Sequence, residues 1–247
     1  METQLFYLLI FPLAVLQTIV GVGVLVLGTP LLLIFNYDII EIINLLAPIS
    51  IITSLLNYLY LKYNKKNLKI NLDKSIKKTF IIICLPGMTI GLVLAREFID
   101  IINFEITISL IIFLSLFITW GLKNLINSLP LFIKKIILMF IAIIHGLTNS
   151  GGTLLAIFFT SLAKNKKDQS RYSITFHYLI LVFFQYLLFL MVFKKEIFID
   201  NLFNIFLIIT LASFVGNIIS KTIDEKFFKK TIEILALFSA FYLLINN

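Results

Sequence analysis

The chain has 247 residues, of which 60% are hydrophobic and 14% are charged, and its mean hydropathy is +1.04. A typical soluble domain carries nearly twice that share of charged residues, so the composition excludes a soluble protein and indicates an integral membrane protein. The formal net charge of +8 could indicate a nucleic-acid partner, but the placement of the basic residues, described below, excludes that class.

Eight hydrophobic segments follow one another along the chain, with polar connectors between them. They lie at residues 5–36, 40–60, 79–95, 105–122, 131–163, 172–192, 200–220 and 230–245. A helix rises about 1.5 Å per residue, so about 20 apolar residues cross a hydrocarbon core of about 30 Å. The first and fifth segments are too long for one upright crossing and too short for two. Glycines and small polar residues interrupt both, and each is therefore expected to form a hairpin.

The basic residues are concentrated in some connectors and sparse in others. Eighteen of the 21 Lys and Arg lie in four connectors, at 62–78, 123–135, 164–171 and 221–230. The other connectors, at 36–41, 96–105 and 194–200, hold three basic residues and seven carboxylates. This asymmetry follows the positive-inside rule. We expect a multi-pass protein of the plasma (inner) membrane, with the four basic connectors in the cytoplasm.

This orientation constrains the topology. Six segments alternate as single crossings, whereas segment 131–163 begins and ends on the cytoplasmic side and must turn back within the membrane. The expected fold is an all-α polytopic membrane protein with one transmembrane domain over 1–247. It has repeat one at 1–122, a cytoplasmic linker at 123–130 and repeat two at 131–247. Each repeat is a broken re-entrant helical hairpin followed by three transmembrane helices, and the two repeats are inverted, as in many secondary transporters. The alternative is eight full transmembrane helices.

The interrupted segments are similar to each other. "VGVGVLVLGTP" (20–30) aligns without a gap with "TNSGGTLLAIF" (148–158). The alignment pairs Gly23 with Gly151 and Gly28 with Ala156. This match of small residues supports two related hairpins.

Polar residues near the two breaks are the candidate substrate site. A helix that begins at membrane depth exposes unpaired N–H groups and a partial positive charge, and both favour an anion. The candidate substrate-binding residues are Gln17, Thr18, Gly21 and Gly23 in the first hairpin and His145, Asn149, Ser150, Gly151, Gly152 and Thr153 in the second. Asn149 and Ser150 are expected to cap the following helix, and Gly151 and Gly152 to let a ligand approach the backbone. Capping alone, or helix packing, is the alternative.

Further polar residues are expected to line the path. Ser50, Ser54 and Asn57 fall on one helical face, and Ser213 and Asn217, four residues apart, form a similar stripe. Interhelical hydrogen bonding is the alternative. His145 and His177 are the ionisable residues within the hydrophobic segments once interfacial groups are set aside, so only histidine could relay protons there.

Three stretches carry a resemblance to a known family. "GVGVLVLGTPLLL" at the first break, "HGLTNSGGTLLA" at the second and the terminal "SFVGNIISKTIDEKFFKKTIEILALFSAFYLL" resemble the sulfite exporter TauE/SafE family of membrane transporters. The resemblance covers essentially the whole chain. It implies passage of small sulfur-containing or carbon-based anions, such as sulfite or organosulfonates.

The sequence therefore predicts an exporter of a small anion, such as sulfite or an organosulfonate. The alternatives are a carrier of another small organic anion and a non-transporting membrane scaffold. No HExxH, GxSxG, buried Asp pair or Cys/His cluster appears, so no enzyme, cofactor or metal is expected. The expected partners are the anionic substrate and the lipid bilayer, with no nucleic acid, and a homo-oligomer is left open.

Overall fold

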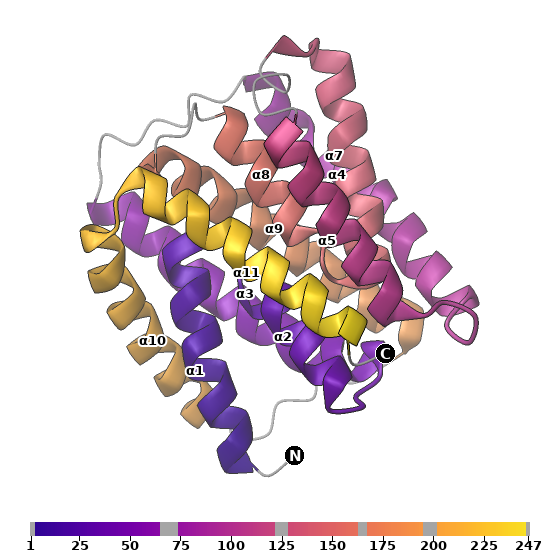
Figure 1. Cartoon of the computed structure of the whole chain (residues 1–247), viewed down its shortest axis with the longest axis horizontal. Helices are drawn as coiled ribbons and strands as arrows, with labels where there is room; N and C mark the ends of the chain where they lie inside the picture. The colour runs from indigo at the N-terminus through magenta and orange to yellow at the C-terminus, as the bar shows by residue number, and fades with distance from the viewer. Residues whose placement is uncertain (1–2, 65–73, 122–127, 163–166, 195–201, 246–247) are drawn as a thin grey trace.

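The computed structural model describes residues 3–64, 74–121, 128–162, 167–194 and 202–245, which are almost entirely helical (Figure 1). In chain order the helices are α1 (Thr3–Val20), α2 (Val24–Ile34), α3 (Ile39–Asn64), α4 (Lys74–Glu97), α5 (Phe104–Gly121), α7 (Leu131–Thr148), α8 (Gly152–Leu162), α9 (Lys167–Phe193), α10 (Leu202–Thr222) and α11 (Glu225–Ile245). Parts of the predicted connectors fall outside these ranges, as does most of the linker 123–130.

Helix lengths match a polytopic membrane protein. Within the described residues, α3, α4, α7, α9 and α10 each contain an apolar stretch of 18 or more residues that is long enough to cross a membrane. The prediction of an all-helical multi-pass membrane protein is confirmed. The predicted connectors were too long, however. α9 begins at Lys167 and α11 at Glu225, so the last part of each preceding basic connector belongs to a helix.

Each of the two interrupted segments forms a pair of helices. α1 and α2 occupy residues 3–20 and 24–34. Adding 128 to these numbers gives 131–148 and 152–162, which are the bounds of α7 and α8. Gly21 has a φ of 98° at the first break and Asn149 a φ of 61° at the second, so the backbone turns through the left-handed region at both breaks. Glycine and asparagine tolerate that region best.

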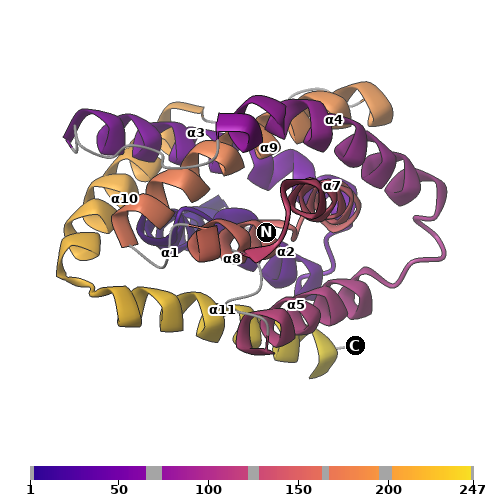
Figure 2. The same ribbon diagram turned by 90° about the horizontal axis from the view of Figure 1, so that it is seen from above.

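The paired helices lie in the middle of the molecule. Figure 2 shows α1, α2, α7 and α8 between a layer with α3, α4 and α9 and a layer with α5 and α11. The most extensive contacts join α4 to α7, α1 to α10, α5 to α11 and α3 to α9. Polar groups on the central helices are therefore shielded by the outer layers.

Glycines allow the closest helix crossings. A Cβ atom on Gly91 of α4 would collide with the carbonyl oxygen of Ile143 on α7 and would lie 3.0 Å from the Cα atom of Gly146. On the other side of the molecule, a Cβ atom on Gly216 of α10 would lie 2.7 Å from the Cβ atom of Thr18 on α1. Small residues at helix crossings are the usual means of close packing in membranes.

We predict that Gly91→Ala lowers the free energy of unfolding by about 1–3 kcal/mol, because the added methyl group must push α4 away from α7. Thermal unfolding of the detergent-purified protein measures the loss. Val93→Ile is the matched control, since it adds one methylene group to an exposed side chain of the same helix. Equal stability of Gly91→Ala and the control would contradict the close crossing.

Candidate functional site

Buried polar side chains gather at two adjoining places in the interior. The first, which we call the break cluster, lies at the two helix breaks and consists of Gln17, Thr29, Ser50, Ser54, His145, Asn149, Thr153 and Tyr178. The second, which we call the arginine cluster, consists of Thr18, Asn57, Arg171, Thr175, Asn217 and Ser220. The α3 stripe Ser50, Ser54 and Asn57 runs from the first cluster to the second.

Gln17 organises the first break. Its side-chain Oε1 accepts a hydrogen bond from the backbone N–H of Val24 (2.9 Å), the first residue of α2, and another from the Ser50 hydroxyl (3.1 Å). Its Nε2 donates to the Ser50 carbonyl (2.8 Å) and the Ser54 hydroxyl (2.9 Å). Residue 23 must be a glycine, because a Cβ atom there would lie 2.7 Å from the backbone nitrogen of Gln17. A side chain from α1 thus satisfies the first N–H of α2 and ties the start of that helix to α3.

Asn149 organises the second break, but its role differs from the predicted one. It caps the end of α7, with its N–H donating to the His145 carbonyl (2.9 Å), and does not cap α8. Its side-chain Nδ2 instead donates to the Thr29 hydroxyl of α2 (3.0 Å), which joins the two hairpins. The Ser150 hydroxyl donates back to the Thr148 carbonyl (3.2 Å), so the prediction that Ser150 caps α8 is wrong as well.

Protein atoms fill the space beside the glycines of the second break. A Cβ atom on Gly151 would lie 2.6 Å from the Cβ atom of His145, and one on Gly152 would lie 2.9 Å from the Tyr178 ring. The glycines therefore let α8 approach α7 and α9, and here it is the chain itself, rather than a ligand, that comes close to them. The Tyr178 ring lies 6.0 Å from the His145 ring, and its hydroxyl faces Ser50 and the backbone of Leu25. Tyr178 thus connects the two breaks.

Several buried polar atoms at the second break have no hydrogen-bond partner within the described part of the chain. They include both ring nitrogens of His145, the side-chain oxygen of Asn149 and the hydroxyls of Thr153 and Tyr178. Unsatisfied polar groups are costly in an apolar interior and call for a bound molecule. An imidazole N–H and a hydroxyl can both donate to an anion.

Arg171 was missed by the sequence analysis, which placed it in a cytoplasmic connector. The structure corrects this: Arg171 lies in the second turn of α9 and is 2% exposed. Its Nε donates to the Thr18 carbonyl (2.7 Å) and its Nη1 to the Ser220 hydroxyl (2.7 Å). Its Nη2 donates to the side-chain oxygens of Asn57 (2.7 Å) and Asn217 (2.6 Å). All four acceptors are neutral.

The other predicted path residues divide into two groups. Asn57 and Asn217 contact Arg171, and Asn217 also donates to the Ser213 carbonyl (2.8 Å), so one residue of each predicted polar stripe, on α3 and on α10, contacts α9. His177 lies elsewhere, among phenylalanine rings, with its ring stacked on that of Phe159 at a centroid distance of 4.1 Å. Its Nδ1 is 2.7 Å from the Ser173 carbonyl oxygen.

Among the residues that the structure describes, Arg171 is the buried side chain with a full positive charge, and no Asp or Glu is buried. The buried polar residues in this part of the chain are Ser, Thr, Asn, Gln, two His and Arg171. The start of α2 and of α8 adds the partial positive charge of a helix N-terminus. The arrangement can bind an anion and would repel a cation.

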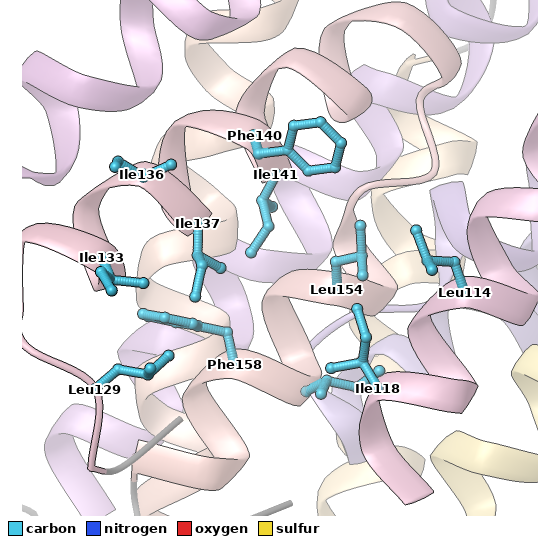
Figure 3. Close-up of a pocket in the computed structure, with 11 residues that line it drawn as sticks. Leu114, Ile118, Leu129, Ile133, Ile136, Ile137, Phe140, Ile141, Leu154 and Phe158 are labelled. Carbon is cyan, nitrogen blue, oxygen red and sulfur yellow. The ribbon is translucent and has the colours of Figure 1, made fainter. Parts of the chain in front are cut away.

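A separate cavity of about 440 Å³ lies between α5, α7 and α8 (Figure 3). Its lining residues, among them Leu114, Ile137, Phe140, Leu154 and Phe158, are all apolar. None of the predicted substrate-binding residues lines it. A charged substrate would have no polar partner there, so we do not place the site in this cavity.

Comparison with known proteins places the chain in a family. The family model described as Sulfite exporter TauE/SafE matches residues 6–243. No curated protein and no solved structure matches the chain.

We predict that Gln17→Leu lowers the free energy of unfolding by about 1–3 kcal/mol, because the Val24 N–H and the Ser50 hydroxyl lose their acceptor in an apolar interior. Thermal unfolding gives the loss, and hydrogen exchange is expected to become faster at the start of α2. Thr89→Val is the control, since the Thr89 hydroxyl donates only to Leu85 in its own helix. Unchanged exchange at Val24 would contradict the capping role.

Proposed function

The chain belongs to the sulfite exporter TauE/SafE family and is a multi-pass membrane transporter, and from this premise we propose that it exports a small anion such as sulfite or an organosulfonate. The anion binds in the break cluster. This substrate identity and this direction of transport go beyond family membership, and the following features of the chain support them.

We propose that the two halves are inverted repeats. The equal numbering offset of 128 between the two helix pairs supports this. The packing supports it as well. Exchanging the two halves turns the contact of α1 with α10 into the contact of α7 with α4. The same exchange leaves the contacts of α3 with α9 and of α5 with α11 unchanged. Gly216 of α10 meets Thr18 of α1 at one crossing. The equivalent residues in the other half are Met88 of α4 and Gly146 of α7, and these meet at the equivalent crossing. A pseudo-twofold axis relates such halves in many transporters.

In this proposal each hairpin is re-entrant. α2 and α8 have 11 residues each and span about 17 Å, roughly half of a hydrocarbon core. Both begin at a break beside the break cluster. Their N-terminal ends can therefore face a common anion, while the Asn149–Thr29 hydrogen bond holds the two hairpins together.

The single observation that carries the anion assignment is the set of buried, unpartnered polar atoms at the second break in an interior without buried carboxylates, within the residues that the structure describes. A scaffold does not need such atoms at this depth. With the basic connectors in the cytoplasm of an inside-negative cell, an exported anion gains about 2.3 kcal/mol per charge and 100 mV. The proposed export therefore needs no coupling ion.

We predict that proteoliposomes loaded with unlabelled sulfite take up labelled sulfite by counterflow, and that His145→Ala and Asn149→Ala each slow this exchange about ten-fold or more. His145→Ala removes an imidazole donor to a charged ligand, which is worth about 1.5–3 kcal/mol, whereas Asn149→Ala removes the hydrogen bond to Thr29 that holds the two hairpins together beside the site. Initial uptake rates, corrected for the amount of folded protein inserted, measure the effect.

Ser109→Ala is the matched control, because the buried Ser109 hydroxyl donates to the Ala240 carbonyl between α5 and α11, away from the breaks. Small sulfonates and small carboxylates tested in place of sulfite distinguish the substrate class. If the folded wild-type protein exchanged none of these anions, the scaffold alternative would replace the transporter proposal.

A further inference from the structure

We propose that Arg171 forms a second anion-binding station on the cytoplasmic side of the break cluster, which receives the substrate before it reaches the breaks and selects anions over neutral molecules. This inference rests on the proposed function and adds a residue and a location to it.

The charge of the buried Arg171 side chain supports this proposal. A guanidinium group is charged at all working pH values, and placing it at membrane depth is expensive. The four oxygens that accept its hydrogen bonds are neutral carbonyl, amide and hydroxyl oxygens, and the nearest carboxylate that acts on it, that of half-buried Asp168 three residues earlier on α9, accepts none of these bonds. An oxyanion offers the same kind of acceptor atom together with a full negative charge, and such charge-assisted bonds are roughly twice as strong as neutral ones. A small anion can therefore displace the Asn57 and Asn217 amide oxygens from Arg171.

The arginine cluster lies near the ends of three helices. Arg171 lies four residues after the first residue of α9, and its partner Ser220 lies two residues before the last residue of α10. Asn57 lies seven residues before the end of α3. All three helix ends adjoin basic connectors, which places the arginine cluster toward the proposed cytoplasmic side. Asn57 in the arginine cluster and Ser50 in the break cluster are seven residues apart on α3, a distance of about 10 Å along the helix axis. Ser54 lies between them.

Two hydroxyl groups beside Arg171 are available as further hydrogen-bond donors. The hydroxyls of Thr18 and Ser170 are buried and have no hydrogen-bond partner among the described residues. Thr18 is held against Arg171 within the arginine cluster, because its carbonyl accepts from both Arg171 and Asn57. Ser170 precedes Arg171 in α9. These hydroxyls can donate to the oxygens of an anion that Arg171 holds.

The other half of the chain supplies a comparison. With the offset of 128, Arg171 corresponds to Ile43, Thr175 to Ala47 and Ser220 to Leu92, and these three residues are buried and apolar. The equivalent position therefore packs well without a charge. The arginine is a departure from the repeat on one side of the membrane only, which fits a role in receiving substrate better than a role in packing.

The test compares Arg171→Gln, which removes the charge, with Arg171→Lys, which keeps the charge but loses the planar fork. In the sulfite counterflow assay we expect Arg171→Gln to raise the KM about ten-fold or more, with a smaller change in maximal rate, and Arg171→Lys to fall between it and the wild type. Sulfite is also expected to raise the unfolding temperature of the wild type in detergent, and to do so less in Arg171→Gln. A purely structural arginine would change stability but not the shift caused by sulfite.

Two further variants keep the test decisive. Lys167→Gln is the matched control: it removes a positive charge one turn away, from a side chain that donates to the Ser220 and Ile223 carbonyls, and is expected to leave the KM within about two-fold. Asn217→Asp presents a carboxylate to the intact Arg171 with almost no change of shape. It should raise the KM as Arg171→Gln does, because the internal carboxylate competes with the substrate, and it takes the place of Arg171→Gln in the test if that variant fails to fold.

An unchanged KM and an unchanged sulfite-induced shift in folded Arg171→Gln, or in Asn217→Asp, would overturn the inference while leaving the proposed function intact. Absence of exchange by the wild type would instead overturn the proposed function itself.

Discussion

The unpaired N–H groups of a helix that begins inside an apolar core are the constraint on which this structure depends. Lipid cannot accept hydrogen bonds from them, so each break needs a polar partner from the protein or from a ligand. At the first break, Gln17 accepts from Val24 and also binds α3. At the second break, the Thr153 N–H donates to the Ser150 carbonyl (3.4 Å), while Asn149 bends the chain and its side chain reaches across to Thr29. The helices around the breaks are then fixed in place by the groups that satisfy them.

The same constraint explains the chemical character of the interior. Neutral amides and hydroxyls at the breaks, with Arg171 nearby, leave the buried part of the described chain with one positive side chain and no negative one. The polar face of α3 joins the two breaks to the arginine cluster. We regard this continuous polar interior, enclosed by apolar outer helices, as the physical basis for anion transport in this member of the family.

Much of the fold could be predicted from the sequence, because the apolar segments are long and glycines mark both breaks. Periodicity alone placed Ser50, Ser54 and Asn57 on one face, and that face is the one that contacts Gln17 and Arg171. Contacts between distant segments were not predictable: Asn149 was expected to cap α8, but a partner 120 residues away takes its side chain. Arg171 was missed because a charge beside a basic connector is usually solvated. The polar Ser170, Ser173 and Thr175 around it were the available signal.

The most direct test of the account is to locate the anion. A crystal structure of the protein grown with selenate, with data collected at the selenium absorption edge, would show where a tetrahedral oxyanion binds. We expect an anomalous peak within hydrogen-bond distance of His145, Asn149 or Thr153, between the starts of α2 and α8. A peak confined to the surface, with the His145 and Thr153 donors still unoccupied at saturating selenate, would contradict it.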